Sequence, residues 1–163
     1  MSLSRFNSAQ ASETSALLLR CCGSPRWSVR VAACRPYPDV ESMLAAMDEA
    51  SYDMTPQDLS EALEAETPQL PFPGDATNAA DGRRGVLAAH TALRAAHAAY
   101  ENRFGYAFLI CLDDCHPDER LDAALAGVRA RLGNDPENER IRAAEELRRL
   151  ARGRLARLVV AAR

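Results

Sequence analysis

The sequence predicts an all-α fold, a single compact domain of about seven or eight helices. Hydrophobic residues make up 47% of the 163 residues and aromatic residues only 6%, so alanine and leucine carry most of the apolar content, which favours packed helices. Apolar residues recur every three or four positions along most of the chain. A chain of this length buries roughly two thirds of the surface that it exposes when unfolded, which suffices for one core. We expect residues 1–11 to form a flexible N-terminus and residues 12–163 to form the helical domain.

The first half of the chain predicts four helices divided by glycine and proline. Residues 12–22 carry apolar side chains at helical spacing after Ser12, a residue type that caps helices. A glycine and a proline then interrupt the pattern, which resumes over 26–34 and stops before the next proline. Residues 39–50 and 55–66 open with an aspartate and a threonine at the cap position, and the second has proline at its first helical position.

The second half predicts three helices and one segment of open assignment. From residue 86 onward, one helix face is predicted by residues that step by four and three positions: Val86, His90, Leu93, His97, Tyr100 and Phe104. Residues 104–112, FGYAFLICL, are aromatic and branched enough for a strand, but no second strand-like run exists to pair with them. The sequence is equally compatible with an extended connection and with a buried helix for this segment. Residues 117–132 and 136–160 predict two further helices.

Charge and cysteine content exclude several classes of function. The net charge is −3, and all twenty basic residues are arginines, so a Schiff-base lysine and a phosphate-loop lysine are excluded. Arginines of the last third alternate with glutamates, which is typical of a solvated helix face and not of a nucleic-acid interface. No apolar run approaches the ~20 residues that cross a bilayer, and the opening residues lack a secretion signal. We expect a cytoplasmic protein with five reduced cysteines, none in a paired zinc spacing: Cys21, Cys22, Cys34, Cys111 and Cys115.

Two features that could mark a site have plain structural interpretations. The segment EAETPQLPFPGDATNAADGRRGV, residues 64–86, reads by composition as a proline-rich connection between two helices. His116 follows two aspartates and a cysteine, but a lone cluster is weak support for a metal site, and a turn with a helix cap is the better prediction.

Several short blocks of the sequence carry a resemblance to a known family. CCGSPRW with RPYP, then YENRFGYAFLIC, RLGNDPENE and EELRRLARGRL follow one another over about residues 17–160. They resemble the signature blocks of the 2-oxo-4-hydroxy-4-carboxy-5-ureidoimidazoline (OHCU) decarboxylase family. The resemblance implies an all-helical homodimer without metal or organic cofactor. It further implies action after urate oxidase and hydroxyisourate hydrolase, on a small ureide that bears a carboxylate, to give (S)-allantoin.

Decarboxylation sets clear demands on such a site. Loss of CO2 leaves a carbanion beside a carbonyl, so the site must hold the carboxylate, spread the developing charge and deliver a proton to one face. In the family, a histidine in a His-Pro pair is taken as the acid. Pro68 matches the family proline, but Thr67 stands at the histidine position. A threonine hydroxyl is far too weak an acid to replace an imidazole at neutral pH.

The substrate-binding residues that the resemblance implies are partly changed. With Gly85-Val86 as the anchor, the Ser-x-x-Glu-Gln motif of the family falls on Ala79, Gly82 and Arg83. Arg154 falls on the arginine that the family uses in its last helix. The segment that supplies backbone contacts in the family is retained as Phe108, Leu109, Ile110, Cys111 and Leu112.

Three hypotheses follow from these changes. The first is an OHCU decarboxylase whose acid has moved to His97, with Asp81 or Asp75 in place of the glutamate. The competing and favoured interpretation of His97 is structural: a histidine that is satisfied within an apolar helix face or at a dimer contact. The second is a non-catalytic or repurposed member that binds a small anion or a protein partner. The third is a recruited enzyme for another carbonyl-containing molecule, with His97 as acid or base.

Overall fold

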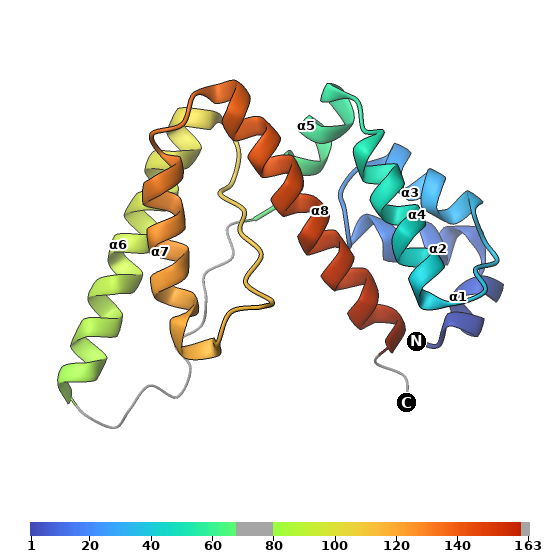
Figure 1. The fold of residues 1–163 in the computed structure, drawn as a ribbon, viewed down its shortest axis with the longest axis horizontal. Helices are drawn as coiled ribbons and strands as arrows, with labels where there is room; N and C mark the ends of the chain where they lie inside the picture. The colour runs from blue at the N-terminus through green and yellow to red at the C-terminus, as the bar shows by residue number, and fades with distance from the viewer. Residues whose placement is uncertain (68–79, 161–163) are drawn as a thin grey trace. The chain divides into compact units, whose positions relative to one another are not determined.

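The computed structural model describes residues 1–67 and 80–160, with side chains for 1–67 and 85–159. Within these ranges the chain forms eight α-helices, one 3₁₀ helix and no strand, which confirms the all-α prediction (Figure 1). Two compact units divide the chain: Met1–Glu66 with Leu147–Arg163, and Thr67–Glu146. Helix α8 (Pro136–Val160) contributes residues to both units.

The first unit is built around α3, which contacts α2, α4 and α5. Its five N-terminal helices are α1 (Leu3–Ser8), α2 (Ala11–Leu19), α3 (Pro25–Ala33), α4 (Val40–Tyr52) and α5 (Pro56–Glu64). Trp27 of α3 is buried, and its indole N–H donates a hydrogen bond to the Ser51 hydroxyl at 2.9 Å. The core also includes Phe6, Leu18, Val31, Met43, Met47, Leu63 and Leu155.

Capping explains where two of these helices begin and corrects one prediction. The Asp39 carboxylate accepts a hydrogen bond from the Ser42 N–H at 2.7 Å, which starts α4. Thr55 and Asp58 form a capping box at the start of α5, as the sequence predicts. Ser12 is not a cap, because α2 starts at Ala11 and its cap position is Gln10, which makes no side-chain cap bond. Ser12 instead lies in the first turn of the helix.

The first eleven residues, for which we expect flexibility, contain helix α1. Phe6 of this helix is 0% exposed. The Arg35 guanidinium lies over the Phe6 ring, 5.7 Å from its centroid. Its Nη1 donates hydrogen bonds to the carbonyls of Phe6 at 2.8 Å and Ala9 at 3.0 Å and to the Thr14 hydroxyl at 2.7 Å. One cation therefore satisfies three oxygens of the N-terminal segment, and this bonding joins α1 and α2 to the end of α3.

The second unit consists of α6 (Ala80–Phe104), a 3₁₀ helix η1 (Pro117–Glu119), α7 (Arg120–Arg131) and the first part of α8. Helices α6 and α7 lie side by side (Figure 1). Gly105 ends α6 in the left-handed conformation, with φ 83°, a common way for a helix to end. Residues 107–112 form neither helix nor strand, so the open segment is a connection. The core of this unit consists of Leu93, Tyr100, Phe108, Ala124 and Val128.

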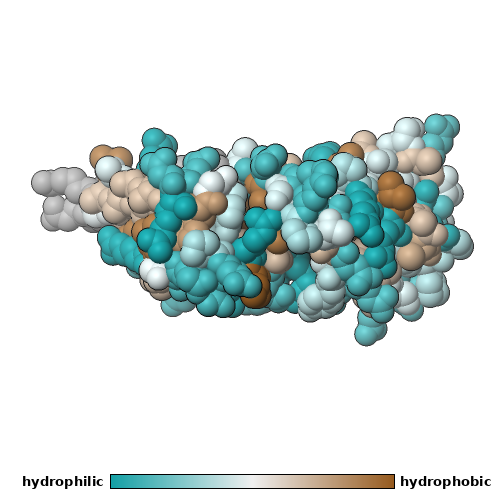
Figure 2. Space-filling view, turned by 90° about the horizontal axis from the view of Figure 1, so that it is seen from above, coloured by the Kyte–Doolittle hydropathy of each residue, from teal (hydrophilic) through white to brown (hydrophobic). Residues whose placement is uncertain are grey.

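Exposed apolar residues are scattered over the described surface. On the face that Figure 2 shows, hydrophilic residues predominate and hydrophobic ones lie apart from one another. The most exposed large apolar residues, Val29, Tyr52, Leu87 and Ile141, lie on four different helices. Single exposed apolar residues are ordinary and do not mark an interaction patch. Among the described residues, no helix is both long and apolar enough to cross a membrane.

Truncation of Phe6 tests whether α1 belongs to the folded core. We expect Phe6→Ala to lower the free energy of unfolding by about 3 kcal/mol, because it removes a fully buried ring. Val29→Ala, at an exposed position of α3, should change this free energy by about 0.5 kcal/mol or less. Urea unfolding followed by circular dichroism measures both, and equal effects would show that α1 is not docked in solution.

Candidate functional site

Most residues of the altered motifs lie outside the described residues or in a part of α6 whose backbone alone is described. Pro68 and Ala79 lie outside the described residues. Gly82 and Arg83 belong to α6 by their backbone, and the described side chains of that helix begin at residue 85. Thr67 is described: it follows α5, lies in no helix and is exposed. The position that the resemblance assigns to the family acid therefore carries an exposed hydroxyl.

The retained segment 108–112 packs into the core of the second unit. Phe108 and Leu109 are buried, and the three residues that follow them are half-buried. The ring of Phe108 meets that of Tyr100 edge to face, with the ring centroids 5.0 Å apart. The Arg131 guanidinium carbon lies 4.6 Å from the centroid of the Phe108 ring, within cation–π range. This packing fixes the start of the segment.

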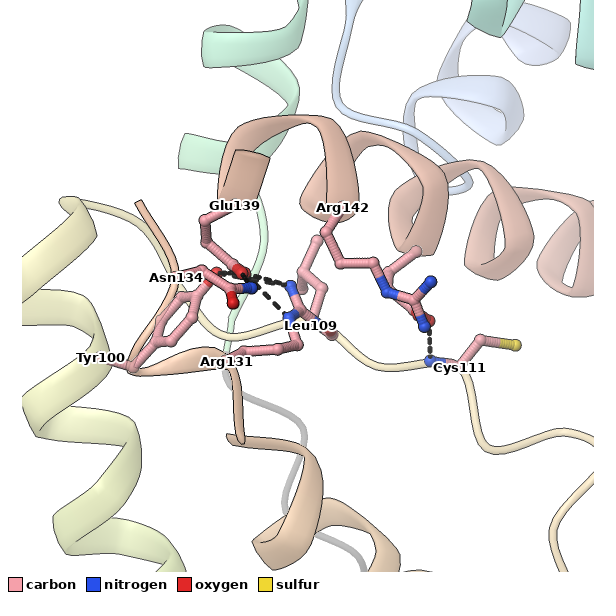
Figure 3. Close-up of polar contacts among 8 residues, drawn as sticks. Tyr100, Leu109, Cys111, Arg131, Asn134, Glu139 and Arg142 are labelled. Atoms are coloured by element: carbon pink, nitrogen blue, oxygen red, sulfur yellow. Dashed lines mark hydrogen bonds and ion pairs between the residues drawn. The ribbon is translucent and has the colours of Figure 1, made fainter. Parts of the chain in front are cut away.

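A buried ion pair holds the backbone of this segment (Figure 3). Arg131, at the end of α7, donates from Nη1 to the Leu109 carbonyl at 2.6 Å, and from Nε at 2.8 Å and Nη2 at 2.5 Å to one oxygen of Glu139. Tyr100 donates its hydroxyl to the same oxygen, and Asn134 donates to the other oxygen of Glu139 at 2.8 Å. Both charged groups are buried, and their hydrogen-bonding capacity is used within this network.

A second acid of α8 holds the same segment two residues later. The Cys111 N–H donates to Glu146 at 2.8 Å, and the exposed Arg142 pairs with Glu146 at 3.0 Å (Figure 3). Glu139 and Glu146 are seven residues apart, or about two helical turns, so both project from one side of α8. The Cys111 N–H, which the resemblance implies is a substrate contact, is therefore bonded within the chain.

Sequence reasoning missed these buried acids. The acids Glu139 and Glu146 and their neighbour Arg131 lie in the blocks RLGNDPENE and EELRRLARGRL, which carry the resemblance. The alternation of arginine and glutamate from residue 140 onward predicts a solvated face, and for Glu146 this prediction is wrong, because it is buried, as is Glu139 just before that stretch. Their spacing of seven residues within α8 was the available signal.

His97 is a buried imidazole without a hydrogen bond to any described residue. It is 5% exposed, neither ring nitrogen has a partner in the described part of the chain, and its ring lies 5.5 Å from that of Phe108. His90, two turns earlier on α6, is half-buried, and its Nε2 is likewise unpartnered there. Burial lowers the pKa of His97, and Glu101 offsets this only in part. The ring is therefore neutral at neutral pH.

Arg154, in the first unit, is already paired with a carboxylate. Its Nη1 lies 2.5 Å from Oε1 of Glu66 and its Nη2 lies 2.8 Å from Oε2, a two-pronged pair. Its Nη1 also donates to the Cys21 carbonyl at 3.0 Å. The hydrogen bonds that Arg154 donates to Glu66 raise the pKa of Arg154. The cation that the resemblance assigns to the substrate thus has an internal partner, and Glu66 directly precedes Thr67 in the chain.

The cysteines are free thiols, and His116 caps a short helix. All five thiols are free, and burial raises the pKa of Cys21 and of Cys22 to about 11, so neither is a thiolate nucleophile at neutral pH. His116 caps η1 by accepting a hydrogen bond from the Asp118 N–H at 3.4 Å. The described residues contain no group of three or more side chains that could hold a metal ion.

The buried ion pair gives a stability prediction. Glu139→Gln removes the charge that balances Arg131 in the core, and we expect it to lower the free energy of unfolding by about 3–5 kcal/mol. Glu137→Gln, two residues earlier and exposed, is the matched control and should have little effect. Guanidinium unfolding measures both variants, and a small loss for Glu139→Gln would contradict the proposed hold on Leu109.

The lowered pKa of His97 predicts how stability depends on pH. The unfolded chain takes up a proton near the ordinary histidine pKa of about 6.5, while the folded chain resists it. The contribution of His97 is therefore constant above about pH 6.5 and is lost as the pH falls below that value toward the folded pKa.

Unfolding measured between pH 7.5 and 5 isolates this contribution. We expect His97→Asn to flatten the loss of stability below about pH 6.5 relative to wild type. Identical profiles for wild type and His97→Asn would show that His97 titrates in the folded protein as it does in the unfolded chain.

Comparison with known proteins identifies the fold and the family. The family model described as OHCU decarboxylase matches residues 7–156, a range that spans both compact units. No curated protein matches the sequence at a significant level.

Two solved structures are similar to this chain. One is an (S)-allantoin synthase, with a TM-score of 0.71 and 16% identity, covering 98% of this chain and 54% of that chain. The other is an OHCU decarboxylase in the presence of (S)-allantoin, with a TM-score of 0.68 and 22% identity, covering 92% of this chain and 98% of that chain. This chain thus spans about half the length of the (S)-allantoin synthase, and both likenesses concern the fold. From the match to the family model, the chain belongs to the OHCU decarboxylase family.

Proposed function

We propose that this chain is a cofactor-free carboxy-lyase of the urate-degradation type, which converts OHCU to (S)-allantoin slowly. The observation that carries the proposal is the match to the OHCU decarboxylase family over residues 7–156. The hydrogen bonds that fix the backbone at residues 109 and 111 support the proposal, because a site that contacts its ligand through backbone groups requires those groups to be fixed. A homodimer and a cytoplasmic location, both expected from the resemblance and the composition, are part of the proposal.

The reaction needs no oxidant or metal to balance. The bond between C4, the ring carbon that bears the hydroxyl, and the carboxylate carbon breaks, CO2 leaves, and the electron pair forms a C4–C5 double bond while the charge moves to the nitrogen of the adjacent C5=N bond, which takes up one proton. The resulting enol then becomes a ketone: the C4 hydroxyl loses its proton to become the carbonyl, C5, the carbon that bears the ureido group, gains a proton, and addition to one face of C5 gives a single enantiomer. A protein promotes these steps by orienting the carboxylate, by placing N–H donors where negative charge develops, and by supplying the proton.

The bonding of residues 109 and 111 indicates which backbone groups can serve a ligand. In an extended segment, the N–H and C=O groups of alternate residues point to the same side. The Leu109 carbonyl and the Cys111 N–H both bond to side chains of α7 and α8. We infer that the N–H and C=O of Ile110, between them, point to the opposite side. Ile110 thus offers a neighbouring donor and acceptor, which suit a ureide.

Proton delivery is the step that this chain performs poorly. Thr67 is exposed and carries no group that titrates near neutral pH. His97 as a relocated acid stays a prediction, and its lowered pKa counts against it, because a neutral imidazole is a much weaker acid than an imidazolium. Without a matched acid, we expect the rate to fall short of a competent relative by about 10²–10⁴-fold.

Freshly generated OHCU tests the activity directly. Urate oxidase and hydroxyisourate hydrolase would produce OHCU in the cuvette, and circular dichroism would follow (S)-allantoin. We expect optically active allantoin to form faster than without the protein. A rate and an enantiomeric excess equal to those of the uncatalysed reaction would contradict the proposal.

Restoring the family acid makes the test sharper. We expect Thr67→His to raise the rate by about 10²–10⁴-fold, because it returns an imidazole to the position of the family acid. Thr67→Asn is the matched control, because asparagine is polar and resembles histidine in size but has no titratable group. We expect this variant to leave the rate unchanged. If both variants stay at the wild-type rate, position 67 is not where the proton is delivered.

The exposed Thr67 also favours a second candidate function. A family member without an acid can retain binding while it loses turnover, and would then be a non-catalytic or repurposed protein that binds a small anion or a protein partner. Calorimetry with (S)-allantoin separates the two candidates. Binding without turnover of OHCU would favour this second function over the first.

A further inference from the structure

The hydrogen bonds that join α6 to other described elements come from its C-terminal end. The Tyr100 hydroxyl donates to Glu139 of α8. Nη2 of Arg103 donates to the carbonyl of Asn134, in the turn after α7, at 3.0 Å. The last residues of α6 are therefore anchored to the rest of the second unit by polar contacts, and residues 85–97 lie before these anchors.

Residues 85–97 of α6 instead dock through their apolar face. Leu93 is 0% exposed and belongs to the core cluster that includes Phe108 and Val128. One turn later, His97 places a polar ring in this apolar contact, with its centroid 5.5 Å from that of Phe108. Buried polar atoms are nearly always hydrogen-bonded, yet neither nitrogen of His97 has a partner in the described part of the chain. The docking of α6 is therefore weakest at this ring.

The charged groups of the surrounding elements leave a protonated His97 without a close partner. Glu101, one turn further along α6, attracts the charge but is exposed to water. On the connection and on α7, the Phe108 ring carries the Arg131 guanidinium at 4.6 Å, which is a like charge. The acids of α8 are already bonded, Glu139 to Arg131 and Glu146 to the Cys111 N–H. The titratable and charged groups of these elements are His90, Tyr100 and Glu101 on α6, Tyr106 and Cys111 on the connection, Arg131 on α7, and Glu139 and Glu146 on α8.

We propose that α6 contains an acid-operated hinge: uptake of one proton by His97 releases residues 85–97 from Phe108, while the anchors at Tyr100 and Arg103 hold. The step consumes one proton from water and breaks no covalent bond. Residues 98 and 99, between the released part and the anchors, form the hinge. The released part continues the backbone of positions 82 and 83, on which the binding motif of the family falls, so the opening moves these positions too. The inference goes beyond the proposed function, because it holds whether or not the chain decarboxylates OHCU.

The direction of the pH effect follows from the burial of the ring. In the docked state burial lowers the pKa of His97, whereas in the opened state water solvates the ring, which then titrates near the ordinary value of about 6.5. The free energy of opening is therefore constant above about pH 6.5 and falls as the pH drops below it. Between pH 7.5 and pH 5, we expect the opened population to rise by about 5–30-fold.

Native-state hydrogen exchange followed by NMR tests the hinge at the Leu93 amide. An undocked helical segment of this length is marginal in water, so its amides exchange once it opens. After correction for the intrinsic pH dependence of exchange, the protection factor of Leu93 should fall by about 5–30-fold from pH 7.5 to pH 5. At pH 5 its exchange should be nearly independent of low urea concentrations, as for a local opening.

Two amides outside the hinge serve as internal controls. Val128 of α7, and Cys111, which is bonded to Glu146, should exchange more slowly than Leu93 and accelerate with urea, because they open when the whole unit unfolds. The hinge is ruled out if Leu93 and Val128 share one opening free energy and one urea dependence at both pH values, because α6 would then open only with the rest of the unit.

Substitution of His97 identifies the group that takes up the proton. In His97→Asn the protection factor of Leu93 should no longer depend on pH in this range. His97→Leu, which replaces the unpartnered ring by an apolar side chain, should give the same result and keeps the test available if His97→Asn does not fold. Thr91→Ala, at an exposed position of the same helix, is the matched control and should retain the wild-type fall. A fall that persists in the His97 variants would overturn the proposal, and no outcome depends on OHCU.

Discussion

The buried pair of Arg131 and Glu139 is the constraint on which the second unit depends. A connection inside an all-helical unit has no neighbouring strand to satisfy its backbone groups, and buried groups of this kind need partners. Arg131 supplies one to the Leu109 carbonyl, and Glu146 supplies one to the Cys111 N–H. Glu139 holds Arg131 in place, with Tyr100 and Asn134 as further donors. Without the glutamate, the arginine would be an unbalanced charge in the core.

Much of the helical framework is readable from sequence. Asp39, Thr55 and Asp58 mark helix starts because a cap is a local interaction between near neighbours in the chain. The face of α6 that includes Leu93 and Tyr100 follows from periodicity alone. Ser12 fails as a cap because α2 already begins at Ala11, and Gln10 at the cap position makes no side-chain cap bond that would mark this start in the sequence.

The buried charges are beyond such reasoning. The sequence does not distinguish a glutamate on the surface from one in the core. Burial depends on partners outside the same helical turn, which local patterns do not reveal. Glu139 and Arg131 are eight residues apart, whereas Glu66 and Arg154 are 88 apart. Arg35 reaches back to Phe6 over 29 residues, which is why the N-terminal helix is hard to foresee. The resemblance to the family pointed to Arg154 but gave no sign of its internal partner.

The backbone segment of this chain is well bonded, but the side chains at the positions that the resemblance assigns to catalysis differ from those of the family. The Leu109 carbonyl and the Cys111 N–H are both hydrogen-bonded to side chains of α7 and α8. Position 67, in contrast, carries an exposed threonine, and Arg154 is paired with Glu66. His97, the remaining buried imidazole, is neutral. Under the proposed function, the threonine at position 67 and the internal partner of Arg154 each weaken the catalysis of decarboxylation, and this is why we propose slow turnover.

Hydrogen exchange at the Cys111 amide tests the central claim most directly. This amide lies outside any helix or strand, yet it is bonded to a buried carboxylate. Native-state exchange followed by NMR should therefore show it opening with about the same free energy as core amides of α7 such as Val128. Exchange at the rate of an unprotected loop amide would contradict the account, because the segment would then be free of the network formed by Arg131, Glu139 and Glu146.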